Sequence, residues 1–410
     1  MQRILVLGAG FAGLWSAVAA ARRLDELGVD ADAVEVLVVN RTPWHSIRVR
    51  NYEADIDPAL VPLADVLDPI GVKHIVANVT DVDVRERTVA CTAGGASERL
   101  TYDRLVFALG SRLALPAIPG LEAHAFDVDT FEAARKLNEH IASLPSLPAS
   151  AGQYSVLVVG AGLTGVEVAT EMVGKLAASH LRASAHAPRP RVILADHCAW
   201  IGSDMGEGAR RVIAEALRNL GVETRPSVSV ASIDAEGATL ATGERIEAAT
   251  VVWCVGMQAD PLTARFPVAR DRLGRLPVDP NLKIKGMAAE FAAGDAAWLP
   301  IDGAHASVMS CQHARPMGRF AGYNAVGDLL RKPMLPLQID WYVTCLDLGA
   351  FGAVYTEGWD RTVAAVGVEA KGIKETINRK RIYPPRSRNR REILEAAAPT
   401  VQTPPKGAAH

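Results

Sequence analysis

Two stretches of the sequence, ILVLGAGFAGLWSAVAA at residues 4–20 and VLVVGAGLTGVEVATEM at residues 156–172, follow one plan. Each runs from four apolar residues through Gly-Ala-Gly, two further residues and a third glycine into a segment typical of a helix. The apolar run predicts a buried strand, and the glycines permit a tight turn, close approach of a pyrophosphate and close packing of helix on sheet. The repetition predicts two dinucleotide-binding units in one chain.

The residues after each glycine pattern complete a strand-helix-strand unit. In the first copy we predict strands at 4–7 and 34–39 around a helix at 11–27; in the second, strands at 156–159 and 191–195 around a helix at about 163–178. Alternating segments follow both units and end in an apolar strand closed by Gly110 or Gly256. A helix at 131–144 separates the copies. We therefore predict an α/β protein with two Rossmann-like domains.

Composition indicates an ordinary soluble globular protein. The 410 residues carry a net charge of -2 and are 49% hydrophobic, so no nucleic-acid partner is expected. The five cysteines are scattered without a Cys-x-x-Cys pair, which favours a reduced, cytoplasmic setting and no metal site. The uncharged run at 4–21 is long enough to raise the question of a signal peptide, but its glycine spacing and internal recurrence favour nucleotide binding.

The end of the second strand in each unit usually carries an acid that binds ribose hydroxyls. The second copy has Asp196 there, which favours NADH over NADPH, although Arg189 and Arg191 lie close by. The first copy has Asn40 followed by Arg41. An amide can bond a ribose hydroxyl but does not supply a charged acceptor.

Four further motifs accompany the glycine patterns: YDRLVFALGS at 102–111, IPGLEAHAF at 118–126, TVVWCVG at 250–256 and FAAGDAA at 291–297. Together these stretches resemble the flavoprotein family with two dinucleotide-binding domains, the pyridine nucleotide-disulfide reductase fold. Within it the sequence is most similar to type II NADH:quinone dehydrogenases, over roughly residues 1–325. The resemblance implies a glutathione-reductase-like architecture in which an NADH-binding domain is inserted into an FAD-binding domain.

The resemblance also assigns ranges and residues. It implies FAD-binding segments at 1–112 and 276–325 and an NADH domain with its linker helix at 113–275. Beyond the resemblance, the change in character at about residue 326 predicts a C-terminal domain at 326–395, and the last residues predict a disordered tail at 396–410. Asp295 would bond the ribityl chain, with a helix N-cap as the alternative. Glu167 matches a glutamate near the nicotinamide, with an exposed helix residue as the alternative. The predicted FAD site comprises Gly8, Gly10, Phe11, Ala12, Gly13, Asn40, Arg41, Ala108, Gly110, Gly294 and Asp295, and the NADH site Gly160, Gly162, Thr164, Gly165, Asp196 and Gly256.

Two features of the sequence bear on the electron acceptor: the lack of redox cysteines and a partial match to a motif of type II dehydrogenases. The stretch NRTPWHSIRVRNYEADID at 40–57 lacks the redox cysteines of related disulfide reductases, so thiol chemistry is not expected. In SVMSCQHARPMGRFAGYNA at 307–325, Gln312 and Ala314 match the Ala-Gln-x-Ala-x-Gln motif of type II dehydrogenases, whereas Cys311 and Pro316 differ. A quinone carbonyl would accept from Gln312 or His313; a helix packed under the flavin is the alternative.

The C-terminal segment KGIKETINRKRIYPPRSRNRR at 371–391 is strongly basic. Ile373 and Ile377 form a weak apolar stripe beside Lys371 and Lys374, which predicts peripheral attachment to the inner face of a membrane; a solvated basic tail is the alternative. We predict an FAD-dependent NADH dehydrogenase that reduces a quinone or similar acceptor. A ferredoxin or rubredoxin reductase and a redox-sensing flavoprotein that acts through partner binding stay open, as do the oligomeric state, a homodimer included, and the pathway.

Overall fold

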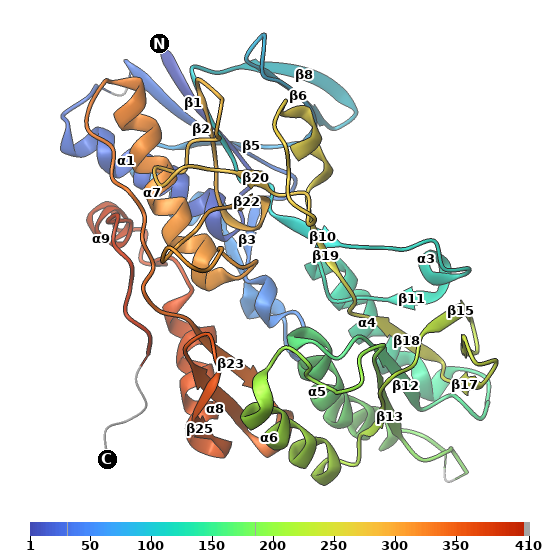
Figure 1. Cartoon of the computed structure of the whole chain (residues 1–410). Coiled ribbons are helices and arrows are strands. Elements are labelled where there is room, and N and C mark those ends of the chain that lie inside the picture. Colours follow the sequence, from blue (N-terminus) through green and yellow to red (C-terminus); the bar gives the residue numbers. More distant parts are fainter. Residues whose placement is uncertain (31, 185, 406–410) are drawn as a thin grey trace.

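Two parallel sheets of five strands each organise the chain. Figure 1 shows the computed structural model, which describes residues 1–30, 32–184 and 186–405. The first sheet has the order β21-β9-β1-β2-β5 and the second the order β11-β18-β12-β13-β14. The first is built from β1 (Gln2–Leu7), β2 (Val34–Asn40), β5 (Lys73–Val76), β9 (Arg104–Phe107) and β21 (Glu290–Ala292). The second is built from β11 (Ala125–Phe126), β12 (Ser155–Val159), β13 (Arg191–Ala195), β14 (Glu223–Arg225) and β18 (Thr250–Trp253).

The two glycine patterns occupy equivalent places in these sheets. β1 and β12 are the central strands, and each leads directly into a long helix, α1 (Phe11–Glu26) or α5 (Leu163–His180). Each copy also carries a three-stranded antiparallel meander. The meanders consist of β6 (Asn78–Asp83), β7 (Thr88–Ala93) and β8 (Ala96–Thr101), and of β15 (Val230–Asp234), β16 (Gly237–Leu240) and β17 (Arg245–Glu247).

The chain passes between the two sheets twice. It leaves the first sheet through β10 (Ser111–Leu113) and returns through β19 (Met257–Ala259), and these two strands pair antiparallel. The helix predicted between the copies is α4 (Phe131–Ser143), capped by the Thr130 hydroxyl, which accepts from the amide of Ala133. Shorter elements complete this part: β3 (Trp44–Ser46), β4 (Leu60–Pro62), α2 (Leu63–Leu67), α3 (Leu121–His124), α6 (Gly206–Asn219), β20 (Leu276–Pro277) and β22 (Ala297–Trp298).

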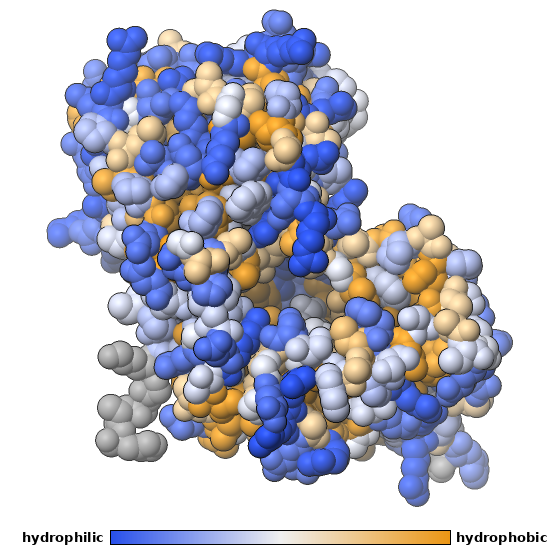
Figure 2. Space-filling model, viewed as in Figure 1, coloured by the Kyte–Doolittle hydropathy of each residue, from blue (hydrophilic) through white to orange (hydrophobic). Residues whose placement is uncertain are grey.

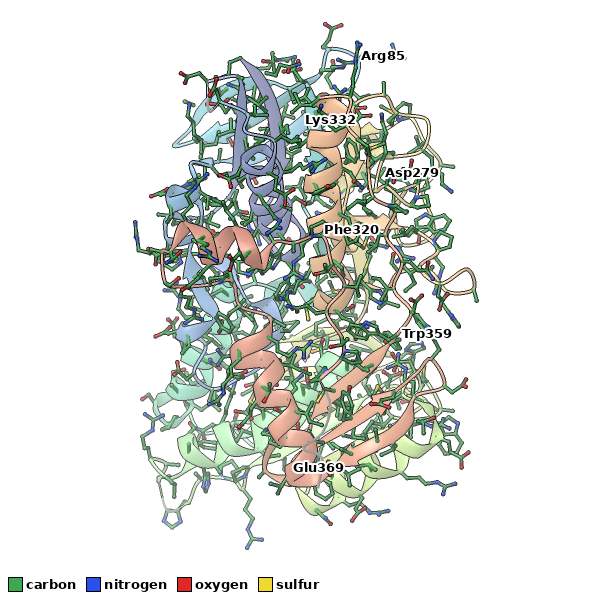
Figure 3. The ribbon with its side chains drawn as sticks, turned by 90° about the vertical axis from the view of Figure 1, so that its left-hand side faces the viewer. Arg85, Asp279, Phe320, Lys332, Trp359 and Glu369 are labelled. Carbon is green, nitrogen blue, oxygen red and sulfur yellow. The ribbon has the colours of Figure 1, made fainter. Side chains whose placement is uncertain are left out.

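Helix α7 (Cys311–Leu329) lies directly against α1, and Figure 3 shows the two side by side. Two glycines make this approach close. A Cβ atom at Gly318 would lie 2.3 Å from the carbonyl oxygen of Ala12, and one at Gly322 would lie 1.9 Å from that of Ser16. Only glycine therefore fits at these two positions of the interface.

The C-terminal part contacts both domains. Its antiparallel sheet of β23 (Val343–Asp347), β24 (Ala353–Glu357) and β25 (Thr362–Val366) carries Leu346 and Val354, which share a core with Ile213 of α6. Helix α8 (Gly367–Thr376) and a π-helical turn at Ile377–Arg381 follow. Helix α9 (Arg390–Ala396) then returns to the first domain, where Ile393 and Leu394 join the core that contains α1.

The structure differs from the predicted disordered tail at 396–410. Ala396 ends α9 and Ala397 is fully buried. Farther on, the carbonyl oxygen of Pro405 accepts a hydrogen bond from the Tyr355 hydroxyl at 3.0 Å. Residues 396–405 are thus held against the protein, and 406–410 lie outside the described residues. Across the described ranges, none of the helices combines the length and apolar character required to span a bilayer.

Candidate functional site

The first Gly-Ala-Gly loop is held in place by hydrogen bonds to the amide and to the carbonyl oxygen of its central residue, Ala9. The amide of Ala9 donates to Oδ1 of Asn40 at 2.9 Å, and its carbonyl oxygen lies 2.8 Å from Nδ1 of His45. Burial lowers the pKa of His45 to about 4, so the ring is neutral and Nδ1 donates. Its buried Nε2 is then an acceptor without a partner among the described residues. These contacts hold the loop in place at the start of α1.

The second loop is braced in the same way by an aspartate. Asp196 Oδ2 accepts from the amide of Ala161 at 2.5 Å, and Oδ1 accepts from that of Cys198 at 2.7 Å. Asn40 and Asp196 therefore occupy equivalent positions, each at the end of the second strand of its unit. The two copies differ there in charge but not in the bond that each makes to its loop.

Both loops have the features that a dinucleotide pyrophosphate requires. Helices α1 and α5 begin without a side-chain cap and without an acid in their first turn. A Cβ atom at Gly10 or Gly162 would meet nothing within 4 Å, which leaves room for a ligand at the helix amides. At Gly13 and Gly165, a Cβ atom would lie 1.9 and 1.7 Å from the carbonyl oxygens of Gly8 and Gly160. These residues fit FAD at the first loop and NADH at the second.

Asp295 lies in a polar cluster formed by residues from both domains. Figure 2 shows a hollow between the upper and lower parts of the molecule. Oδ2 of Asp295 accepts from the Ser111 hydroxyl at 2.6 Å and lies 4.0 Å from Nη1 of Arg48. Arg48 also pairs with Asp129, which precedes α4. Burial raises the pKa of Asp295. Its side chain caps no helix, so the N-cap alternative is not supported.

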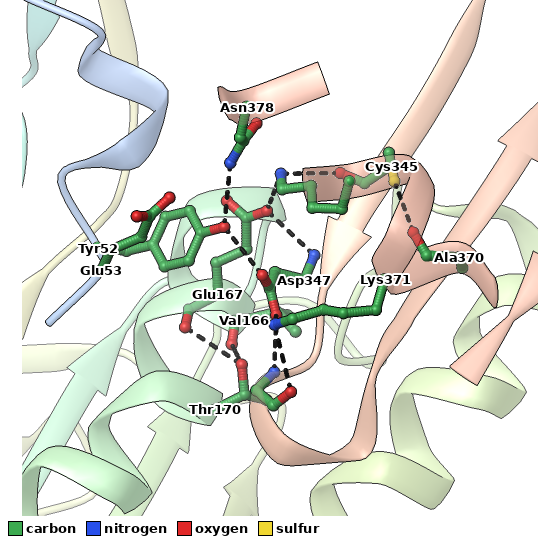
Figure 4. A network of polar contacts seen from close by, with 12 residues as sticks. Tyr52, Glu53, Val166, Glu167, Thr170, Cys345, Asp347, Ala370, Lys371 and Asn378 are labelled. Atoms are coloured by element: carbon green, nitrogen blue, oxygen red, sulfur yellow. Dashed lines mark hydrogen bonds and ion pairs between the residues drawn. The ribbon is translucent and has the colours of Figure 1, made fainter. Parts of the chain in front are cut away.

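Glu167 is buried in an ion pair with the C-terminal part, as Figure 4 shows. Its Oε1 accepts from Nζ of Lys374 at 2.6 Å and from the amide of Asp347 at 3.1 Å. Burial lowers the pKa of Lys374, but attraction by the Glu167 carboxylate outweighs it, so the pKa is raised overall. Glu167 is 8% exposed, so the alternative of an exposed helix residue is wrong.

A second ion pair extends this network. Oδ1 of Asp347 accepts from Nζ of Lys371 at 2.6 Å, and its Oδ2 accepts from the Tyr52 hydroxyl at 3.1 Å. Lys371 and Lys374 were predicted to face a membrane, and that assignment is wrong for both because each ammonium group pairs with a carboxylate inside the protein. Ile373 is likewise buried against the C-terminal sheet.

A mainly apolar pocket lies between α7 and the C-terminal segment. It is lined by Cys311, Gln312, Arg315, Pro316, Arg319, Trp341, Val343, Ile377, Arg381, Ile382, Val401, Gln402 and Pro405. The first turn of α7 also abuts the Gly-Asp loop, since a Cβ atom at Gly294 would lie 3.5 Å from that of Ala314. The pocket is thus next to the predicted flavin site.

The structure separates the two residues predicted to contact the acceptor. Gln312 lines the pocket, and its Oε1 accepts from the amide of Val343 at 3.3 Å. His313 is fully buried and does not line it. Its Nδ1 accepts from the amide of Val308 at 2.9 Å, and burial lowers its pKa to about 4. His313 therefore supports the loop before α7 and is left out of the proposed acceptor site.

Comparison with known proteins identifies the family of the chain. A family model described as pyridine nucleotide-disulphide oxidoreductase matches residues 2–318. The chain belongs to this family. The NADH dehydrogenase-like protein of Mycobacterium tuberculosis (strain CDC 1551 / Oshkosh) is 55% identical, and the match covers 99% of this chain and 100% of the relative. Demethylphylloquinone reductase of Synechocystis sp. (strain ATCC 27184 / PCC 6803 / Kazusa) is 27% identical, with 93% and 91% covered.

The solved structures agree in fold. NDH2 from Plasmodium falciparum, solved in complex with NADH, has a TM-score of 0.74 at 14% identity, and the match covers 96% of this chain and 98% of that one. The predicted resemblance and the α/β fold with two Rossmann-like domains are confirmed. The protein is a flavin-dependent oxidoreductase, and FAD and NADH are the cofactors that its family membership implies.

Several residues of this oxidoreductase were not found from the sequence. Arg48, Asp129 and His45 carry no motif, and their positions depend on contacts that the chain makes over long separations. For His45 and Arg48 the one available signal is that residues 40–57 stand where related enzymes carry redox cysteines, and Asp129 has no such signal. The five cysteines themselves are all free thiols. Burial raises the pKa of Cys311 and raises that of Cys254 to about 12, which disfavours a reactive thiolate.

Proposed function

We propose that this oxidoreductase oxidises NADH through FAD and passes the electrons to a quinone or a similar small acceptor. The observation that carries the proposal is the apolar pocket next to the Gly294-Asp295 loop, in a chain without a cysteine pair at that site. Support also comes from relatives named type II NADH:quinone oxidoreductase, for example that of Staphylococcus saprophyticus, which is 25% identical.

The chain's own residues bind and orient the reactants. The first loop and Asp295 would hold FAD, which when bound would supply two-electron acceptance from NADH and delivery to the acceptor. Asp196 offers its carboxylate to the NADH ribose while it braces the second loop. Gln312 would donate to an acceptor carbonyl through its amide nitrogen, which lies 3.3 Å from Nε2 of His313 and carries two hydrogens, while its oxygen accepts from Val343. Apolar residues around the pocket exclude water.

The function is tested by anaerobic titration of the purified holoprotein. NADH is expected to bleach the flavin absorbance, and a short-chain naphthoquinone is expected to restore it, with turnover well above that with oxygen alone. Gly165→Ala serves as a matched variant, because the new Cβ would lie 1.7 Å from the Gly160 carbonyl oxygen and distort only the second loop. It should retain flavin but bleach with NADH far more slowly. Bleaching without reoxidation by any quinone would refute the acceptor assignment.

Asp196→Asn is expected to weaken the preference for NADH over NADPH. Asparagine can keep the bond to the loop amide, as Asn40 does in the first copy, but it removes the negative charge that opposes a 2′-phosphate. Loss of a charge-assisted bond of about 1.5–3 kcal/mol corresponds to about 10- to 150-fold. The measurement is kcat/KM for both nucleotides. An unchanged ratio in a variant that keeps its flavin would show that Asp196 does not set the choice.

Attachment at the inner face of a membrane stays a prediction, and fewer basic residues support it than the sequence indicates. Arg379 and Lys380 are exposed, whereas Arg388 and Arg390 form ion pairs with Asp65 and Asp25. Fewer basic residues are therefore free for an anionic surface or an acidic electron carrier than the sequence alone indicates. We accordingly rank a small acceptor above a ferredoxin-type partner.

A further inference from the structure

Two arginines lie buried one helical turn apart on α7, within the wall of the apolar pocket. Arg315 is 8% exposed and Arg319 is 3% exposed. Both stand over the ring of Trp15 on α1, with guanidinium carbons 5.3 and 4.4 Å from the ring centre. The pocket places two cationic side chains beside apolar ones such as Ile377.

Neither arginine has a carboxylate partner among the residues that the structure describes. Both Nε atoms are buried without a hydrogen-bond partner there, and Arg319 reaches only the carbonyl oxygen of Thr400, at 3.4 Å. Burial lowers the pKa of Arg315 to about 10. Burial and the neighbouring Arg315 together lower that of Arg319 to about 9. Residues 396–405, the described stretch that passes the pocket, contain no aspartate or glutamate.

Other buried arginines of the chain are paired. Arg50 binds both carboxylate oxygens of Glu53, and Arg275 donates to Asp271 at 2.8 Å. A buried charge without a partner costs several kcal/mol. Two buried arginines that line a cavity and lack a carboxylate partner therefore indicate a missing anion. The planar guanidinium group matches a carboxylate in geometry and charge. The apolar lining of the pocket suits the aromatic body that would carry it.

We propose that the pocket binds an aromatic acid, and that the physiological acceptor is a quinone bearing a carboxylate, which Arg315 and Arg319 hold. The acceptor part rests on the proposed function. NADH supplies a hydride and solvent a proton, so the quinone gains two electrons and two protons to become the hydroquinone, while NAD⁺ is released and the carboxylate is unchanged. The acid group determines which quinone binds and takes no part in the redox step.

Binding is tested first, on the oxidised holoprotein, by calorimetry with 2-naphthoate and its neutral counterpart 2-naphthamide. We expect naphthoate to bind about tenfold tighter or more. Arg315→Gln and Arg319→Gln should each abolish that difference, whereas Arg379→Gln, an exposed change in the same surface region, should keep it. Equal binding of acid and amide by the wild type would overturn the proposal.

Stability provides a second readout, independent of activity. If an anion is the missing partner, Arg319→Gln should unfold at the same denaturant concentration as the wild type or a higher one, and naphthoate should raise the midpoint of the wild type alone. The opposite result is a lower midpoint in Arg319→Gln together with no effect of naphthoate on the wild type. It would show that the arginines hold residues 400–405 in place, and it would overturn the proposal.

Kinetics separate this inference from the proposed function. The probes are a 1,4-naphthoquinone with a propanoate side chain and its methyl ester, which share one ring and differ in charge. We expect the acid to have the lower KM, and Arg315→Gln to erase the difference. Reduction of both at equal KM would refute the acid site and leave the quinone function intact. Arginine-dependent binding of naphthoate without reduction of either quinone would support the acid site and refute the quinone function. Arginine-dependent binding of phosphatidylglycerol vesicles without binding of naphthoate would also overturn the proposal.

Discussion

Lys374→Met is expected to lower the free energy of unfolding by about 3–5 kcal/mol, because it leaves a buried carboxylate unpaired. Methionine keeps the length of the side chain but removes the ammonium group that donates to Glu167 at 2.6 Å and to the carbonyl oxygen of Cys345 at 3.0 Å. Glu167 then keeps one donor, the amide of Asp347. The shift in the denaturation midpoint, followed by flavin and tryptophan fluorescence, measures the effect.

The loss in Lys374→Met should depend on pH. Burial raises the pKa of Glu167 above the ordinary value of 4.5, and the variant lacks the cation that opposes this effect. A carboxyl group whose pKa is raised on folding is protonated in the folded state first, so stability falls as pH rises from the unfolded pKa through the folded one. The variant should therefore approach the wild type near pH 4.5 and differ most at higher pH.

Two further variants test the assignment to this ion pair. Glu167→Gln combined with Lys374→Met should recover part of the lost stability, since it removes both charges. Arg391→Met, which breaks the exposed pair with Glu395, should have no measurable effect. A Lys374→Met protein as stable as the wild type at pH 8 would show that the pair contributes little.

Gly322→Ala should destabilise the protein by about 3 kcal/mol and weaken flavin retention, through overpacking of α7 on α1. The new methyl group would lie 1.9 Å from the carbonyl oxygen of Ser16, a backbone atom that cannot rotate away. The helices must then separate along their length, Gly318 included. Thermal unfolding and the flavin released on gel filtration are the measurements.

Gly174→Ala is the matched control on α5. Gly174 is an exposed helix position where a Cβ atom would meet nothing within 4 Å. Alanine there should stabilise the protein by about 0.5–1 kcal/mol, since it lowers the chain entropy of the unfolded state. If Gly322→Ala matched this control, the close approach of α7 to α1 would not be needed for stability.

The features of the fold that could be predicted are those that depend on local sequence patterns. The glycine spacing, the strands at 4–7 and 156–159 and the helix at 131–144 depend on neighbours within a few residues, and all are found in the structure within a few residues of their predicted ends. Asp196 and Asn40 were also placed correctly at strand ends. What the sequence did not reveal is that each residue braces its own glycine loop, because that bond depends on the turn's three-dimensional course.

Long-range pairing explains most of what was missed. Lys374 meets Glu167 across 207 positions, so the basic segment resembled a surface stripe although two of its lysines are satisfied internally. Arg315 and Arg319 are the opposite case, because these charged side chains are buried without a carboxylate partner among the described residues. Their spacing of four residues shows only that they share a helix face, and nothing local reveals that this face is buried without an acid.

The glycine contacts between α1 and α7 also bear on how such an enzyme could change its acceptor during evolution. Backbone touches backbone there, so the wall that carries Gln312 moves only together with the loop that carries Gly10. The opposite wall, made by Ile382 and Val401, belongs to a separate stretch of chain and contains ordinary side chains. New acceptor shapes would therefore arise by substitutions in the C-terminal wall, while the geometry for hydride transfer is inherited unchanged.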